Sequence, residues 1–357
     1  MECGVRLRLK HELQGTRRLK IGLTYNVKGG AAAESPNAPG LAADAEEEFD
    51  SQETIDSIAD AIRSLGHDVE LLGDGETLLR KLLDRPRPEL VVNIAEGAGS
   101  GRCREARVPA VLEMLGIAYT GSDPLTLAAT LDKDCAKRLV QASGVSTPAW
   151  ALIENGELDS AQERLASLPW PAFVKPAFEG SSKGVLAQSL VRTREELADS
   201  VERAYRAYRQ PIMVEEFIDG DELTVGVVGH RPQHVLGIMR VLPQQKQSSP
   251  FVYSLEVKRD WERQVRYESP AQLSPADTAA VERAALAAWR ALGCRDVSRF
   301  DFRLRDGVPY FLEVNPLPGL SPKTGDLVIL ARGYGVEYSE LISRILNAAI
   351  ERTGAST

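Results

Sequence analysis

The first third of the chain alternates between short apolar runs and amphipathic stretches. Residues 19–27, "LKIGLTYNV", predict a buried strand, and residues 67–72 and 88–97 predict two more. Residues 51–65 place apolar side chains three and four positions apart, which is typical of a helix that packs on one face. Strands that alternate with helices in this way predict a parallel, doubly wound sheet.

The rest of the chain mixes helices with short strands that favour antiparallel pairing. Two of these strands, "SRFDFRL" and "PYFLEVN", flank Asp306 and Gly307 and predict a hairpin. Beyond residue 100, the predicted helices span 107–115, 131–144, 193–208, 274–292 and 338–352. The predicted fold class is therefore an α/β domain followed by an α+β region.

Two segments carry no periodic pattern. Residues 1–18 are basic and predict a frayed arm, and residues 28–48, rich in Gly, Ala, Pro and acid, predict a mobile loop. The N-terminal segment lacks both an uninterrupted apolar core and a small-residue cleavage site, which argues against a signal peptide.

Composition and charge narrow the class of protein. The 357 residues are 43% hydrophobic, enough for a sizeable core in two or three domains. A net charge of −8 and a pI of about 5.3 argue against general affinity for nucleic acid. No apolar run approaches the ~20 residues that span a membrane. The four cysteines form no CxxC pair, which favours a reducing cytoplasm over a disulfide framework or a zinc site. The sequence leaves a homodimer open.

The stretch "FLEVNPLPG", residues 311–319, ends an apolar strand on two oxygen donors, Glu313 and Asn315. These side chains share one strand face, and Asp301 lies on the partner strand. A three-residue connection, 306–308, would place Asp301 opposite Glu313, whereas a two-residue connection would put them on opposite faces. Three oxygen donors on one face suit Mg²⁺. The alternative is a solvated polar edge.

A second candidate site centres on "EGSSKG", residues 179–184, between two predicted strands. Its backbone N–H groups and hydroxyls could cradle phosphate, although for the motif alone a plain hairpin loop is the better explanation. Lys175 shifts the balance, because a lysine at the end of an apolar strand is costly to bury without an anion. Lys133 could equally be a surface charge. Glu215 and Glu222 could accept hydrogen bonds from adenine and ribose, or could be solvent-facing turn residues.

Taken in order, these motifs resemble the ATP-grasp superfamily, and most closely the D-alanine–D-alanine ligases. The resemblance rests on "FVKPAFEGSSKGV", "VEEFIDGDELTVGVV" and "SRFDFRLRDGVPYFLEVNPLPGLSP", and covers most of residues 50–350. It implies a Rossmann-like N-terminal domain (19–125), a central ATP-grasp lobe (126–210) and a C-terminal ATP-grasp lobe (211–357). ATP would lie between the two lobes.

The resemblance also implies roles for individual residues. Glu215 and the Ile218 backbone would hold adenine, and Glu222 would hold ribose. Arg299 would lie beside the reacting carboxyl group. Glu47 would hold the first substrate's ammonium group, and Ser181 would link Glu47 to the loop over the site. The remaining nucleotide-binding residues would be Lys133, Lys175, Glu179, Ser182 and Lys258, and the ligands of two Mg²⁺ ions, or of Mn²⁺, would be Asp301, Glu313 and Asn315.

The implied reaction joins a small-molecule carboxylate to an amine, both of amino-acid type. The carboxylate attacks the γ-phosphate of ATP, and the amine then attacks the resulting acyl phosphate. Arg299 and the Gly319 N–H would stabilise the oxyanion. Residues 179–184 and 241–260 would act as lids that exclude water.

The substrate side of the sequence departs from the ligases. Glu96 stands where the family has the histidine of a His-Gly pair, and Arg259 replaces a tyrosine. "KTGDL", residues 323–327, replaces a Ser-Leu pair that holds the second substrate's carboxylate. Whether Asp326 points into the site is open at this stage. We therefore expect a carboxylate–amine ligase for which D-alanine is a poor acceptor. The alternatives are a ligase of specialised metabolism with other substrates, and a nucleotide-binding protein without turnover.

Overall fold

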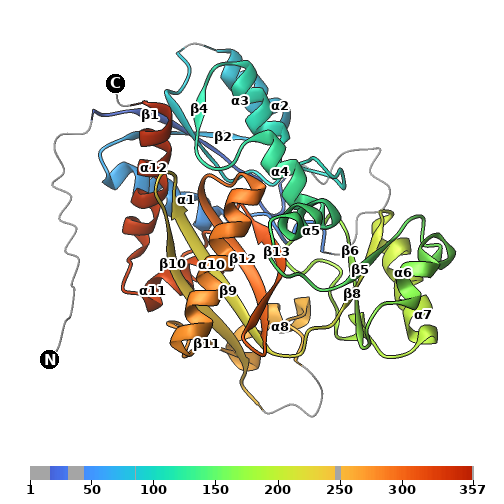
Figure 1. Ribbon diagram of the computed structural model, residues 1–357. Helices are drawn as coiled ribbons and strands as arrows, with labels where there is room; N and C mark the ends of the chain where they lie inside the picture. The colour runs from blue at the N-terminus through green and yellow to red at the C-terminus, as the bar shows by residue number, and fades with distance from the viewer. Residues whose placement is uncertain (1–16, 31–43, 85, 246–250, 356–357) are drawn as a thin grey trace, which may run out of the picture.

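The computed structural model describes residues 17–30, 44–84, 86–245 and 251–355. Most of the predicted arm, 1–18, and residues 31–43 of the predicted mobile loop lie outside the described residues. The described part of the chain contains three sheets, which Figure 1 shows in an N-terminal region, a large C-terminal lobe and a smaller central lobe beside it. The mixture of parallel and antiparallel sheets confirms the predicted fold class.

The N-terminal sheet is parallel, with the strand order β2-β1-β3-β4. Its strands are β1 (Lys20–Thr24), β2 (Asp68–Gly73), β3 (Leu90–Asn93) and β4 (Ala118–Tyr119). They alternate with α1 (Gln52–Ser64), α2 (Gly75–Leu83) and α3 (Arg107–Met114). The Ser51 side chain caps α1 by accepting from the Thr54 N–H, as expected for a helix that begins after Ser51. This sheet is the expected Rossmann-like unit.

The central sheet is antiparallel, with the strand order β5-β8-β6-β7. The strands are β5 (Trp150–Ile153), β6 (Ala172–Pro176), β7 (Leu190–Val191) and β8 (Ile212–Glu216), and α6 (Gln162–Ala166) and α7 (Arg194–Tyr208) complete the lobe. Its small core includes Val174, Leu197 and Val214. Because β8 pairs with β5 and β6, the central sheet includes residues up to Glu216.

The large sheet has the strand order β11-β10-β9-β12-β13. The strands are β9 (Asp221–Gly229), β10 (Gln233–Pro243), β11 (Val265–Glu268), β12 (Asp296–Arg305) and β13 (Val308–Asn315). Helices cover both faces. On one face α10 (Pro275–Leu292) packs with α5 (Lys133–Ala142), which follows α4 (Pro124–Leu131). On the other face lie α11 (Asp326–Gly333) and α12 (Tyr338–Thr353).

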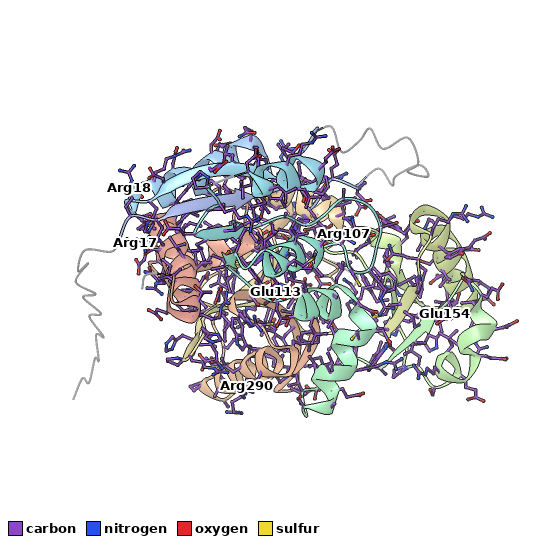
Figure 2. All side chains as sticks on the ribbon, turned by 90° about the horizontal axis from the view of Figure 1, so that it is seen from above. Arg17, Arg18, Arg107, Glu113, Glu154 and Arg290 are labelled. Atoms are coloured by element: carbon purple, nitrogen blue, oxygen red, sulfur yellow. The ribbon has the colours of Figure 1, made fainter. Side chains whose placement is uncertain are left out.

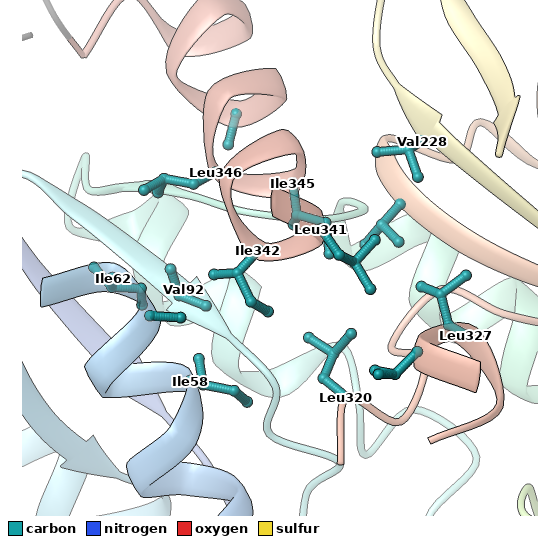
Figure 3. Close-up of a cluster of buried hydrophobic side chains, with 14 of the residues drawn as sticks. Ile58, Ile62, Val92, Val228, Leu320, Leu327, Leu341, Ile342, Ile345 and Leu346 are labelled. Atoms are coloured by element: carbon teal, nitrogen blue, oxygen red, sulfur yellow. The ribbon is translucent and has the colours of Figure 1, made fainter. Parts of the chain in front are cut away.

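One apolar core joins the N-terminal sheet to the large lobe. Figure 3 shows Ile58 and Ile62 of α1 facing Ile342 and Leu346 of α12, and all four side chains are buried. Burial of each such side chain contributes about 1.5–3 kcal/mol. The N-terminal domain is therefore held against the C-terminal lobe, and loops from both can meet over one site.

The hairpin that carries the predicted metal ligands closes through the shorter of the two alternative connections. Asp306 and Gly307, with φ of 52° and 75°, form the two-residue connection, which by itself would put Asp301 and Glu313 on opposite faces. Asp301 nevertheless pairs with Glu313, because the register shifts by one residue at Leu312. An extra residue in one strand moves the rest of that strand to the other face. The bulge therefore restores the pairing that a two-residue turn alone would have prevented.

Charged side chains mark the outside of the molecule. In Figure 2, Arg17, Arg18, Glu154 and Arg290 point outward from the periphery. Throughout the described residues, every helix is too short or too polar to cross a membrane.

Candidate active site

A cavity lies between the central sheet and the large sheet, with about 970 Å³ of space free of protein atoms when the open solvent at its mouth is included. It is lined by residues from β6, β8, β9, β12 and β13 and from the loop after β6. The predicted site residues that line it are Lys133, Lys175, Glu179, Ser181, Ser182, Glu215, Ile218, Glu222, Lys258, Arg299, Asp301 and Glu313. Asn315 lines an adjoining cavity, and Glu47 lies outside both.

Two lysines converge on one carboxylate at the floor of this cavity. Lys175 Nζ lies 2.6 Å from Glu215 Oε1, and Lys137 Nζ lies 2.8 Å from Glu215 Oε2. Burial opposes ionisation of Glu215, but the two lysines outweigh it and lower the pKa of Glu215. Two cations around one anion leave a positive charge beside the cavity, which suits an anionic ligand.

Lys137 is a site residue that the sequence analysis missed. Its side chain is fully buried, donates to Thr147 Oγ1 at 2.9 Å and lies over the Trp150 ring. Burial lowers the pKa of Lys137 to about 8, although Glu215 acts against this shift. The available signal was helical spacing, since Lys137 lies one turn after Lys133 on α5 and shares its face.

The opposite wall combines apolar and polar contacts. Phe217 and Ile218 are buried, and Arg303 lies over the Phe217 ring at 5.1 Å. Arg303 also pairs with Glu222 at 2.5 Å. Burial, helped by the charge of Asp301, raises the pKa of Glu222 despite the presence of Arg303. A flat aromatic-sized ligand would meet apolar side chains here, with carboxylate oxygens at the rim.

The three predicted metal ligands lie together on the β12–β13 hairpin. Asn315 Nδ2 lies 3.4 Å from Asp301 Oδ2, and Glu313 is the register partner of Asp301. Lys133 Nζ lies 3.0 Å from Glu313 Oε2, and the nearby cations lower the pKa of Glu313 to about 2 against the effect of burial. Two carboxylates and an amide oxygen fit a hard divalent cation. Within the described residues no group of three or more His, Cys, Asp or Glu could hold a metal ion, and the third oxygen donor of this predicted set is the Asn315 amide.

The glycine-serine loop is tied to both neighbouring parts of the fold. Lys133 Nζ donates to the Glu179 carbonyl, and the Gly180 N–H donates to Glu48 Oε1 at 2.7 Å. Ser181 and Ser182 have φ of 49° and 60°, so the loop turns sharply beside the cavity. A plain hairpin loop would not need such contacts. They therefore favour a loop that is held over a ligand.

Adjacent glutamates face different surroundings at the edge of the site. Glu47 Oε2 pairs with Arg259 Nη2 at 2.8 Å, where the arginine is half exposed. Glu48 is buried, and its carboxylate contacts Arg104 at 2.8 Å and Lys183 at 3.0 Å. The loop that carries Ser181 therefore meets Glu48, and the structure does not bring Glu47 to that loop. The acidic run 46–48 offered no pattern that separates the three positions.

Asp326 points into the site. Its Oδ2 lies 3.0 Å from Arg299 Nη1, while Arg299 Nη2 lies 2.8 Å from Asp301. The charges of Asp301 and Asp326 outweigh burial and raise the pKa of Arg299. Lys323, which could have neutralised Asp326, instead pairs with Glu53 at the surface. Arg299 is therefore already engaged by two carboxylates.

Known proteins share this arrangement of sequence and fold. A family model described as "D-ala D-ala ligase C-terminus" matches residues 139–347. A D-alanine–D-alanine ligase of an Anaeromyxobacter species is 36% identical, over 82% of this chain and 89% of its own length. The uncharacterized protein y4sG of Sinorhizobium fredii is 34% identical, over 83% of this chain and 87% of its own.

A solved structure confirms the fold. The crystal structure of D-alanine–D-alanine ligase from Bacillus anthracis, complexed with ATP, matches with a TM-score of 0.72 at 21% identity. The match covers 95% of this chain and 99% of that one. The chain therefore belongs to the D-alanine–D-alanine ligase family, ATP-dependent ligases of the ATP-grasp fold that form carbon–nitrogen bonds.

Proposed function

We propose that this protein uses ATP to join a small carboxylate, of amino-acid type, to an amine. The observation that carries the proposal is that two cavities meet at one place. The large cavity and a smaller one, with about 560 Å³ of empty space, share Lys133, Ser181, Arg299 and Glu313 among their lining residues. A nucleotide in the first and a carboxylate in the second would therefore come together beside the β12–β13 hairpin.

The large cavity fits ATP. Adenine would lie against Phe217 and Ile218, with ribose hydroxyls toward Glu222. Lys133, Lys175 and Lys258 would neutralise phosphate oxygens, and the loop 179–184 would cover them. Glu215 sets the positions of Lys137 and Lys175 through its two ion pairs.

The hairpin fits Mg²⁺. Asp301, Glu313 and Asn315 would hold two Mg²⁺ ions, or Mn²⁺, between the nucleotide and the carboxylate. Bound there, the metal supplies charge neutralisation for the transferring phosphoryl group. Arg299 would orient the carboxylate for in-line attack, and with the Gly319 N–H would bind the oxyanion when the amine attacks the acyl phosphate. Glu48, rather than Glu47, is the glutamate that supports the Ser181 loop over the substrate.

The cysteines bear on where the reaction would take place. In the described residues Cys103, Cys135 and Cys294 are free thiols. Unpaired cysteines support the cytoplasmic location that the sequence indicated.

The deciding experiment measures ADP and phosphate from the purified chain with Mg²⁺ and ATP. Pairs of D- and L-amino acids, and amines without a carboxylate, are screened against ATP alone. We expect rapid release only with a matched carboxylate and amine, and mass spectrometry should detect the amide. Tight ATP binding without release under every combination would disprove the ligase and leave a nucleotide-binding protein.

Lys175→Ala is expected to weaken ATP binding by about 1.5–3 kcal/mol, or roughly 10- to 100-fold in Kd, because one charged hydrogen bond is lost. Titration calorimetry measures the effect. Lys323→Ala removes a lysine that is 71% exposed and serves as the control. An unchanged Kd for Lys175→Ala would place its side chain away from the phosphates.

A further inference from the structure

The smaller cavity has one end whose negative charge is not balanced by protein groups. Its lining includes Glu48, Glu96 and Glu105, contributed by loops of the N-terminal domain. The other end of the lining includes Arg299 and Gly319. A ligand that spans the cavity therefore meets an arginine at one end and several carboxylates at the other.

Part of the acidic end is neutralised within the protein. Glu48 and Glu179 share two cations: Arg104 lies 2.8 Å from Glu48 and 3.3 Å from Glu179, and Lys183 contacts both carboxylates. Gly180 N–H and Gln210 Nε2 complete the hydrogen bonding of this group. Two anions and two cations form a closed, fully buried set, so these four side chains need no ligand charge.

Glu96 and Glu105 remain outside that set. Glu105 is only 7% exposed, yet no described residue donates a hydrogen bond or forms an ion pair with it or with Glu96. The other two arginines of the same loop are engaged elsewhere, Arg102 with Asp132 and Arg107 with the Ala98 carbonyl. Neither carboxylate is among the fully buried side-chain atoms without a partner in the described residues, and both line the cavity, where a ligand could supply the missing cation.

The pKa values of both carboxylates, Glu96 and Glu105, are raised. Burial raises the pKa of Glu105 to about 8, with a further rise from the charge of Glu48 that Arg104 partly offsets. Burial and the charge of Glu105 raise the pKa of Glu96. Nearby cations, Arg104 foremost, therefore offset only part of the cost of ionising either group.

We propose that the carboxylate substrate of this ligase is a short diamino acid, whose carboxylate faces Arg299 and whose two ammonium groups bind Glu96 and Glu105. The proposal rests on the proposed function for the identity of the carboxylate as substrate. One ammonium group would satisfy one carboxylate and leave the other unpaired. A second cationic group on a short side chain satisfies both.

The test compares 2,4-diaminobutyrate with norvaline, whose side chain has the same length without the charge, using both enantiomers of each. Calorimetry with a non-hydrolysable ATP analogue and Mg²⁺ measures binding, and ADP release measures turnover. We expect one enantiomer of 2,4-diaminobutyrate to bind at least about tenfold more tightly than norvaline, the gain typical of one added charged hydrogen bond. Equal affinity of the two compounds would overturn the proposal.

Of Glu105→Gln and Glu96→Gln, the variant that removes the partner of the side-chain ammonium should abolish this preference, and the other should weaken the binding of both compounds. Neither variant should change the affinity for the ATP analogue. Glu76→Gln, on the exposed face of α2, is the matched control. A preference that survives in both variants would also overturn the assignment, and thermal melting checks that each variant is folded. If the diamino acid binds preferentially but no amine causes ADP release, the ligase reaction is refuted. The assignment of Glu96 and Glu105 as an ammonium-binding site would still hold.

Discussion

Glu313→Gln is expected to lower the rate of ADP release by about 10³-fold or more, while ATP still binds. Glu313 is the central oxygen donor of the proposed metal site, opposite Asp301 and 3.0 Å from Lys133. Glutamine keeps the shape but removes the charge that attracts a divalent cation. Loss of several kcal/mol of transition-state stabilisation by the metal corresponds to roughly three powers of ten in rate.

Single-turnover ADP release, with ATP affinity measured in parallel, tests this prediction. Glu202→Gln removes an exposed carboxylate on α7 and should leave the rate unchanged. Because Glu313 also pairs with Lys133, thermal unfolding of the variant must be compared with that of the parent protein. Unchanged phosphate release in folded Glu313→Gln would remove this residue from the metal site.

D-Alanine is expected to be a poor acceptor for the parent protein, and Asp326→Ser to improve its kcat/KM by about 10²-fold. Asp326 lies 3.0 Å from Arg299, where an amino-acid acceptor would place its own carboxylate. Two like charges at ~4 Å repel by about 4 kcal/mol at an effective dielectric constant near 20. Arg299 offsets part of this repulsion, so the gain in rate is smaller than the full figure implies.

Steady-state kinetics with D-alanine, and with an amine that lacks a carboxylate, measure the change in preference. Asp326→Asn keeps the shape of the side chain and should show the same direction of change, whereas Asp56→Ser, on the exposed side of α1, should have no effect. Efficient use of D-alanine by the parent protein, with kcat/KM near 10⁴ M⁻¹s⁻¹ or above, would contradict the prediction. The site would then bind the carboxylate of the acceptor despite the negative charge of Asp326.

The sequence by itself determined the local structure and the chemistry of the nucleotide half. Periodicity and capping residues located helices such as α1 and α10, because their signals depend on neighbours within a few positions. The motifs around Lys175, Glu215 and Glu313 also identified side chains that line one cavity. Each is attached to a strand end, so a correct strand assignment carries the functional group with it.

Long-range packing decided what the local pattern left open. The bulge at Leu312 set the register of the β12–β13 hairpin, and the fold of the loop before α1 placed Glu48, rather than Glu47, in the buried network. Lys137 entered the site because α5 packs between the two lobes, and Asp326 turned inward toward Arg299. In each case the outcome depends on charges and contacts from residues far away in sequence, whose positions only the tertiary structure specifies.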